Sequence, residues 1–572
     1  MRYVSLRPAL IGAALLVLTA CADKTADEPV AEAVSRPVST TPTAPTSDQN
    51  HRDIDLKVFM RHVRMLSADE FGGRSPASLG EEKTINYLRD ELRNMGVGPG
   101  NGNSYFQDVP LVTMTATPDE VMTVRNDSAE TIDLQFGPDM VIWTKRVTSR
   151  SEINDSEMVF VGYGIVAPEY NWNDYEGVDV EGKTVVILVN DPGYATQDPE
   201  LFNGNAMTYY GRWTYKFEEA AKQGAAGALV IHETAPAAYP WSVVEGSWTG
   251  AQHDLVTPDK NMGRAAIEGW ITDVRADQLF KAMGSSYEQA KKDALDRNIK
   301  AQPMGMSVSA GLSNTISVAD SQNVVGKIEG SDRPDEYILY MAHWDHLGID
   351  PTLEGDQIYN GAVDNATGTA GLLMIARAFT QLDVKPERSI LFVAVTAEES
   401  GLLGSRQFAN NPPMPLKKIV GGINMDALNV YGPTRDVSVI GYGSSELEQY
   451  LAKAASAQGR TIGPEPTPER GYFYRSDHFN MSKKGVPMLY AKGGVNLIDG
   501  GVEAGTAAQT AYTVNDYHKP SDEINDSWKP TGTAEDLQMF FDIGKQLAME
   551  STFPSWYPGN EFRAIREASM AE

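Results

Sequence analysis

YILYMAH, residues 337–343, fixes the local fold, because an unbroken apolar run ends there in a histidine. An apolar run of this length without helical periodicity is typical of a strand that is buried on both faces. Two further runs of this kind follow, SILFVAVT at 389–396 and IVGGINM at 419–425. Helices cover both faces of sheets built from such strands, so the runs predict the α/β class, with a mixed central β-sheet flanked by helices.

Side chains that can bind a metal stand at the end of each run. His343 ends the first run, Glu398 and Glu399 follow the second after one alanine, and Asp426 directly follows the third. Open α/β sheets bind ligands at the carboxyl ends of their strands. We therefore expect these four side chains to lie close together at one edge of the sheet.

Three more residues extend this set. Asp364 lies in the turn GAVDNATG at the start of a predicted helix over 369–380, where backbone N–H groups surround its carboxylate. His518 follows the loop 514–517, and Asp345 stands two residues after His343, where its carboxylate can accept the second N–H of that imidazole. Nitrogen and oxygen donors of this kind suit Zn²⁺, so the combined set predicts a metal site.

Five stretches of the chain resemble, in sequence and in order, the signature segments of the M28 family of co-catalytic zinc peptidases. They are MAHWDHLG, NGAVDNATGTAGLL, TAEESGLLGS, INMDA and YHKPSDE, and the resemblance covers roughly residues 312–548. The family includes bacterial aminopeptidases and glutamate carboxypeptidases. The resemblance implies a zinc-peptidase fold of the phosphorylase/hydrolase-like type, peptide substrates and two Zn²⁺ ions per chain.

The resemblance also implies which residues hold the metal ions. Asp364 would bridge the two zinc ions. His343 and Asp426 would bind one of them, and Glu399 and His518 would bind the other.

Glu398 is the general base that the resemblance implies, because it stands beside a ligand without being one. Such a carboxylate takes a proton from the attacking water and passes it to the leaving amine. Tyr517, directly before His518, resembles a family tyrosine that helps to hold the oxyanion, although packing beside a ligand explains its position equally well. His346 and His478 are candidates for pocket walls or for contacts behind the ligands.

The function that follows is a zinc-dependent exopeptidase that removes N-terminal residues, a metallo-aminopeptidase. A carboxypeptidase or dipeptidase of the same family is an alternative, and it would need arginines to grip a terminal carboxylate. Arg475 and Arg377 are candidates, but the motif segments hold no clustered set. A glutaminyl cyclase with one zinc ion and a non-catalytic binding module with none are weaker alternatives, against which the full ligand set argues.

The N-terminus has the pattern of a secretory signal peptide over residues 1–20, with two arginines, an apolar run at 9–18 and small residues. The run ends in LTAC, which resembles the lipobox of bacterial lipoproteins, and Cys21 is the one cysteine in the chain. We therefore expect an exported cell-envelope protein, lipid-anchored through Cys21 on the periplasmic side or at the outer membrane. Residues 21–50 have the composition of a disordered tether.

A chain of 572 residues predicts two or more folded domains. The first part of the catalytic domain is expected at 51–150 and its zinc-binding part at 306–555, followed by a C-terminal tail at 556–572. Residues 151–305 resemble a β-rich protease-associated (PA) domain inserted between these parts. The net charge of −28 argues against nucleic-acid partners, and the sequence leaves the oligomeric state open.

Overall fold

The computed structural model describes residues 54–247, 250–298 and 301–571, and these belong to one compact unit. The predicted signal peptide, the tether and Cys21 lie outside the described residues. Among the described helices, none combines the length and the apolar character that a bilayer crossing needs.

Three parallel strands form the centre of the sheet. β14 (Arg333–His343) lies between β17 (Arg388–Val395) and β18 (Ile419–Asn424), and β18 pairs in turn with β21 (Met488–Gly493). His343 is in register with Val395, and Met341 with Asn424, so the carboxyl ends of the three strands meet at one edge. The three predicted strands are confirmed, and so is the α/β class with a mixed sheet.

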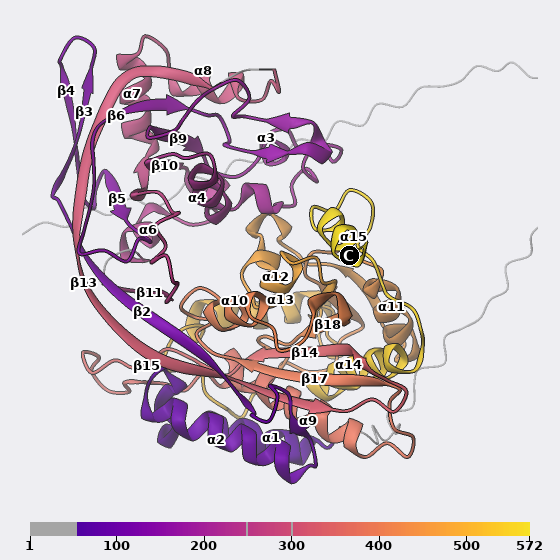
Figure 1. The fold of residues 1–572 in the computed structure, drawn as a ribbon. Coiled ribbons are helices and arrows are strands. Elements are labelled where there is room, and N and C mark those ends of the chain that lie inside the picture. The colour runs from indigo at the N-terminus through magenta and orange to yellow at the C-terminus, as the bar shows by residue number, and fades with distance from the viewer. Residues whose placement is uncertain (1–53, 248–249, 299–300, 572) are drawn as a thin grey trace, which may run out of the picture. The chain divides into compact units, whose positions relative to one another are not determined.

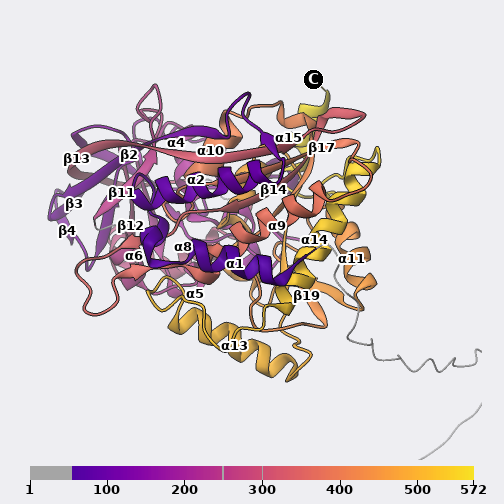
Figure 2. The ribbon, with the colours of Figure 1, turned by 90° about the horizontal axis from the view of Figure 1, so that it is seen from below.

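Helices cover both faces of these strands (Figure 1). Tyr340 and Phe392 face a core that includes side chains of five α-helices, whereas Leu339 and Leu391 face a second core on the opposite side. The helices of the first core are α1 (Leu56–Leu66), α2 (Leu79–Asn94), α9 (Gly368–Thr380), α11 (Leu447–Ala457) and α14 (Thr531–Met549). Those of the second are α10 (Leu403–Asn410) and α12 (His478–Ser482). Figure 2 shows α1, α2 and α9 running across the sheet.

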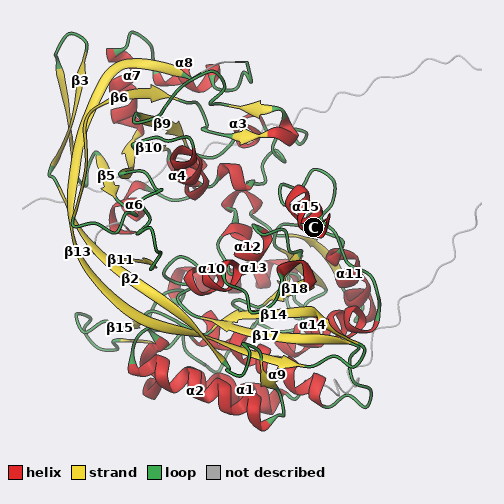
Figure 3. Ribbon diagram, viewed as in Figure 1, coloured by secondary structure: helices red, strands yellow, loops and turns green. Residues whose placement is uncertain are grey.

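A single long strand, β13 (Gln302–Ile328), joins the region of the predicted insertion to the central strands (Figure 3). Its C-terminal part pairs with β17, and its N-terminal part pairs with β6 (Arg150–Phe160). Its middle part pairs with β2 (Phe106–Pro118), and residues 306–309 of its N-terminal part also pair with β3 (Val121–Asn126). The boundary predicted at residue 306 therefore falls inside one continuous strand.

The region predicted as an insertion has its own parallel strands. β9 (Thr184–Leu188) and β10 (Gly227–His232) pair with each other, and β10 also pairs with β12 (Ile267–Thr272). Phe217 of α4 (Trp213–Lys222) packs against these strands in a separate core with Trp143 and Val230. The assignment of this region to the PA family stays a prediction.

The remaining elements are short or lie at the edges. The strands are β1 (Gly98–Pro99), β4 (Thr131–Gln135), β5 (Met140–Trp143), β7 (Val166–Ala167), β8 (Trp172–Asn173), β11 (Ala251–Leu255), β15 (Gly348–Ile349), β16 (Ile358–Tyr359), β19 (Asp436–Val439) and β20 (Thr461–Pro464). The helices are α3 (Pro192–Thr196), α5 (Thr234–Ala237), α6 (Trp241–Ser247), α7 (Asp273–Ala282), α8 (Tyr287–Asp293), α13 (Gly501–Asn515) and α15 (Arg563–Ala571).

The segment predicted as a C-terminal tail is packed against the fold. Trp556 is buried and donates its indole N–H to the carbonyl oxygen of Gly485. Arg566 of α15 donates to the carbonyl oxygen of Ile419 at 2.8 Å, at the start of β18. These buried contacts make residues 556–571 part of the body of the protein rather than a free extension.

Candidate metal centre

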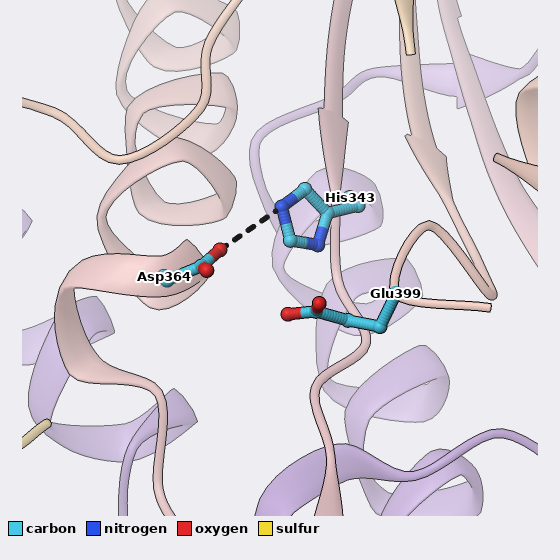
Figure 4. A group of neighbouring side chains, drawn as sticks. All are labelled: His343, Asp364 and Glu399. Carbon is cyan, nitrogen blue, oxygen red and sulfur yellow. Dashed lines mark ion pairs between the residues drawn. The ribbon is translucent and has the colours of Figure 1, made fainter. Parts of the chain in front are cut away.

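Asp364 lies between two histidines. Its Oδ1 is 3.3 Å from Nε2 of His343, and its Oδ2 is 3.3 Å from Nε2 of His518. Figure 4 shows His343, Asp364 and Glu399 converging from a strand end, the helical turn Ala362–Thr367 and a loop. One carboxylate thus faces a different imidazole with each of its oxygens, which is the arrangement of a bridging ligand.

Each histidine has a further carboxylate on its own side. Oδ1 of Asp426 is 3.4 Å from Nε2 of His343, and Oε2 of Glu399 is 3.0 Å from Nε2 of His518. The structure therefore brings together all five predicted ligands, and it groups them in the two sets that the family resemblance implies.

Neighbouring side chains hold these two carboxylates in place. Ser476 donates its hydroxyl to Oδ2 of Asp426 at 2.6 Å. Nδ1 of His346 lies 2.7 Å from Oε1 of Glu399. Each carboxylate therefore directs one oxygen into the cluster and uses the other to fix its own orientation.

The loop that carries Asp364 is fixed from behind by Asp522. The backbone N–H groups of Val363 and Asp364 donate to the two oxygens of Asp522, at 3.0 Å each. Asn365 donates its side-chain amide to the carbonyl oxygen of Met425 at 3.0 Å, which ties this loop to the end of β18. Interactions of this kind orient ligands and are a regular part of metal sites.

Asp345 lies behind the site but acts through different atoms from those predicted. Nδ1 of His343 is 3.2 Å from the main-chain oxygen of Asp345, whereas the Asp345 carboxylate is 3.8 Å from it. A carbonyl oxygen only accepts, so Nδ1 carries the hydrogen and Nε2 is free to bind a metal. The Asp345 carboxylate accepts instead from the backbone N–H groups of Glu398 and Glu399, at 3.1 and 3.4 Å.

A buried arginine from the N-terminal part of the chain supports the same loops. Arg74 is 1% exposed, and it donates to the carbonyl oxygens of Trp344 at 2.8 Å, Asn360 at 2.6 Å and Gly361 at 2.9 Å. These carbonyls belong to the segments that follow His343 and precede Asp364. One guanidinium group therefore fixes the separation of two predicted ligands.

Packed carboxylates control the proton affinities of the site. Burial opposes charge on His343, but Glu398, Asp364 and Asp426 outweigh it and hold the pKa of His343 well above its usual range. Asp364 and Glu399 likewise raise the pKa of His518 to about 10, against the effect of burial. In the absence of a metal, protons on the histidines supply positive charge that metal ions provide when bound.

Glu398 has the opposite environment to Glu399. Burial raises the pKa of Glu398 well above its usual range, and the charges of Glu399 and Asp426 raise it further. For Glu399 burial acts in the same direction, but His346 and His518 overcome it and lower the pKa to about 2. Two adjacent glutamates with separated proton affinities are suited to different roles, one as an acid–base group and one as a ligand.

The donor set fits metal ions. His343, Asp364 and Glu399 each offer a ligand atom, and the three atoms lie within 4.8 Å of one another; His343, Glu398 and Asp426 form a second such set. Nε2 of His518 is buried without a properly oriented hydrogen bond among the described residues, although two carboxylates surround it. Imidazole and carboxylate donors directed at a common space are what Zn²⁺ binds.

The other predicted residues have varied positions. Tyr517 is 44% exposed, and its ring stacks on that of His518 with centroids 3.9 Å apart. His478 is fully buried against Phe473, at a centroid distance of 4.5 Å, which makes it a core residue rather than a pocket wall. Arg377 belongs to the last turn of α9 near His62 of α1, whose pKa is lowered to about 4 by burial, by Arg61 and then by Arg377, so it is not a substrate-binding candidate.

Sequence patterns did not assign the supporting contacts of Arg74, Asp522 and Ser476. Arg74 ends the stretch LSADEFGGR, which resembles the segment that opens the catalytic domain in many M28 proteins. Asp522 belongs to the motif YHKPSDE, and Ser476 precedes the SDH aspartate. The motifs could therefore have marked these three residues as part of the site. Their hydrogen-bond partners depend on the tertiary structure, which the motifs do not reveal.

Part of the chain matches a known protein family. Residues 323–540 match the model of peptidase family M28. Aminopeptidase NAALADL1 of Mus musculus is 36% identical over 129 residues, 22% of this chain and 16% of its own. The glutamate carboxypeptidase 2 homolog of Caenorhabditis elegans is 36% identical over 391 residues, 59% of this chain and 46% of its own. The chain thus spans less than half the length of these two curated relatives.

Among solved structures, the aminopeptidase from Aneurinibacillus sp. strain AM-1 aligns with a TM-score of 0.46 at 18% identity, over 88% of this chain and 96% of its own.

Proposed function

We propose that this chain, through its M28 peptidase segment, is a zinc-dependent exopeptidase that removes N-terminal residues from peptides. The observation that carries the proposal is Asp364, whose two oxygens face His343 and His518 at 3.3 Å each. We assign one zinc site to His343, Asp364 and Asp426. The second site consists of Asp364, Glu399 and His518.

Two zinc ions, when bound, would lower the pKa of a water between them and polarise the carbonyl group of the peptide. Glu398 is the residue of this chain that moves the proton. Its carboxylate accepts a proton from the attacking water and then donates it to the leaving amine. Its backbone N–H is fixed on Asp345, so the side chain starts from a defined position beside the ligands.

Tyr517 is our candidate for a donor to the oxyanion of the tetrahedral intermediate. The stacking of its ring on His518 supports this role, because it keeps the tyrosine beside a predicted ligand. Its partial exposure is compatible with contact to a substrate that enters from solvent.

The preference for a free N-terminus rests on charge. The site is lined by carboxylates, and Asp477 adds another that is fully buried. An α-ammonium group is attracted to such a site, whereas a terminal carboxylate is repelled unless cations neutralise the field. The aminopeptidase NAALADL1 relatives agree with this choice.

A carboxypeptidase is the second candidate, and one observation favours it. Arg212 precedes α4 and is 8% exposed, and its Nε has no hydrogen-bond partner among the described residues. Nε and Nη2 of Arg475, next to Ser476, are buried and equally without a partner. Two such guanidinium groups suit a substrate carboxylate, and a glutamate carboxypeptidase 2 homolog is among the relatives.

The location and the inserted region remain proposals as well. We propose that the mature chain is lipid-anchored at Cys21 in a bacterial cell envelope, which the LTAC sequence supports. We also propose that residues 151–305 are a PA domain that restricts access to the active site. The contact between Lys483 of α12 and Glu218 of α4, 2.8 Å apart, agrees with a fixed position of this region beside the catalytic segment.

Hydrolysis of matched substrates tests the choice between the two exopeptidases. Zinc-loaded protein lacking residues 1–21 would be assayed with aminoacyl anilides, their N-acetylated forms and peptides with a blocked C-terminus. The proposal expects cleavage of the free-amine substrates and loss of cleavage on acetylation. Cleavage that tolerates acetylation but requires a free carboxylate would identify a carboxypeptidase, and no turnover with two bound zinc ions would reject both peptidase assignments.

A further inference from the structure

A cavity of about 390 Å³ lies between the region predicted as an insertion and the C-terminal half of the chain. Three segments line it: residues 169–207, with Glu169, Tyr170 and Glu200; residues 441–474, with Glu465, Phe473 and Tyr474; and residues 558–561, with Glu561. None of the predicted metal ligands lines it.

Glu465 is the unusual residue of this cavity. Glu465 is 8% exposed, and its Oε1 accepts one long hydrogen bond from the backbone N–H of Gly441, at 3.3 Å. Oε2 is buried and has no partner among the described residues. Burial raises the pKa of Glu465 to about 7, although the Gly441 N–H and the charges of Lys492 and Arg475 oppose this shift. A buried carboxylate oxygen without a hydrogen-bond partner is costly in a folded protein, and a cationic donor in the cavity would satisfy it.

The rest of the lining has the character of a cation site. Glu169 and Glu200 contribute further negative charge, and both line the same cavity. Tyr170, Phe473 and Tyr474 contribute aromatic rings, which attract cations to their faces. These rings are held by their neighbours: Tyr170 stacks on Phe202 at 4.3 Å between centroids, and Tyr474 donates its hydroxyl to Glu561 at 2.9 Å.

We propose that this cavity is a binding site for an organic cation, an ammonium or guanidinium group that pairs with Glu465 between aromatic walls. A metal ion fits less well. Within the described part of the chain, two sets of His, Asp and Glu side chains are close enough to hold one, and both contain His343 of the metal centre. Aromatic walls also offer a metal ion no ligand atoms, whereas they bind organic cations.

The cavity is near the catalytic cluster along the chain. Tyr474 lines the cavity, and Ser476, two residues later, donates to Asp426 at 2.6 Å. Two residues span at most about 7 Å between Cα atoms. The cation can therefore be a free small molecule or the basic side chain of a peptide that extends from the metal centre.

Binding of a monovalent probe and its neutral isostere tests the site without any hydrolysis. N-butylguanidinium and N-butylurea have the same shape and differ in charge. Calorimetry on the zinc-loaded protein should show the guanidinium binding at least about tenfold more tightly, as expected for a charge-assisted pair with a buried carboxylate. Glu465→Gln should abolish this difference, and Glu503→Gln, which removes the same charge from an exposed position of α13 outside the cavity, should retain it.

The thermal midpoint of Glu465→Gln without a probe shows whether the variant folds. It should equal or exceed that of the wild type, because the substitution removes a buried carboxylate that lacks a partner. Equal binding of the two probes by the folded wild-type protein, or the same preference in Glu465→Gln, would overturn the proposal.

A second arm identifies the source of the cation. Ala-Arg, Ala-Gly-Arg and Ala-Gly-Gly-Arg would be compared with peptides that carry citrulline, the neutral isostere, in place of arginine. A lower KM for one arginine peptide that disappears in Glu465→Gln assigns the cavity to a substrate side chain. Probe binding without such a difference assigns it to a free cation. The calorimetric arm also separates this proposal from the peptidase proposal, because it does not require turnover.

Discussion

Two buried clusters of charged residues differ in how they balance their charge. In the region predicted as an insertion, Lys216 is fully buried with Asp191 and Asp174. The second cluster lies where the central strands end, and Asp364, Glu398, Glu399 and Asp426 surround His343 there. We call it the catalytic cluster, after its proposed role. The first cluster contains its own cation, whereas the second has only titratable imidazoles inside it.

The Lys216 cluster is satisfied by the fold alone. Lys216 donates to the carbonyl oxygen of Tyr163 at 2.6 Å, and Asp191 accepts from the hydroxyl of Thr208 at 2.8 Å and from backbone N–H groups. Burial lowers the pKa of Lys216 to about 7 and raises those of Asp191 and Asp174 to about 6, while their mutual attraction opposes both shifts. Such a cluster stabilises one conformation and needs no ligand.

The catalytic cluster is not satisfied in the same way. Its carboxylates raise the pKa values of His343 and His518, which means that the site draws in positive charge from whatever source is present. The comparison teaches that burial of charge does not by itself mark a functional site. An excess of carboxylates around imidazoles does, because only added cations can balance it.

The largest expected effect is on catalytic rate, and it should come from a substitution in the catalytic cluster that leaves stability unchanged. Glu398→Gln should lower kcat by about 10²–10⁴-fold, because a general base is lost. Zinc content and the thermal midpoint should stay at wild-type values, since Glu398 is not a proposed ligand and the neutral amide replaces a carboxyl with a strongly raised pKa. Steady-state kinetics and metal analysis measure both. Glu399→Gln is the matched control, for which loss of zinc is expected.

The second prediction concerns the Lys216 cluster, where a substitution should lower stability and leave zinc binding unchanged. Lys216→Met should destabilise the protein by about 3–5 kcal/mol, because two buried aspartates lose their cation. Zinc content should not change. Denaturant unfolding measures the effect, and Lys222→Met, at an exposed position of the same helix, is the control. A stability loss equal to that of Lys222→Met would remove the distinction between the clusters.

The third prediction concerns metal removal. Zinc at 100 times its dissociation constant should stabilise the chelator-treated protein by about 2.7 kcal/mol per independent site. Thermal unfolding at a series of zinc concentrations measures this. Lys216→Met should gain the same increment, whereas Asp364→Asn should gain little, because its substitution removes a ligand from both proposed sites. An unchanged increment in Asp364→Asn would show that zinc binds elsewhere.

The smallest expected effect tests the support of a ligand. Ser476→Ala removes the donor to Oδ2 of Asp426 and should weaken zinc binding about tenfold, as losses behind a ligand generally do. Competition with a chelator measures the change. Ser151→Ala, at a buried serine of β6 that donates to the carbonyl oxygen of Ala266, is a control that should leave zinc affinity unchanged.

The parts of the site that the sequence predicted are those that depend on local patterns. His343 and Asp426 stand directly at the ends of apolar runs, and a parallel register brings such ends together without further information. The position of Asp364 between the two histidines agrees with the role that the family resemblance implies, whereas its sequence alone would suggest a helix cap.

The parts that sequence did not predict depend on contacts between distant segments. Arg74 reaches the carbonyl oxygen of Trp344, 270 residues later, and its motif marks the residue but not this partner. Asp345 was expected to use its carboxylate on His343, but the backbone after β14 places its main-chain oxygen there instead. The cavity around Glu465 is lined by segments that are far apart in the chain, so no local pattern reveals it.

Zinc content tests the central claim most directly. After loading with zinc and dialysis, metal analysis of the chain lacking residues 1–21 should give close to two zinc ions per chain, and Asp364→Ala should give markedly fewer. One tightly bound ion in the wild type, or none, would contradict a site in which Asp364 bridges two metals.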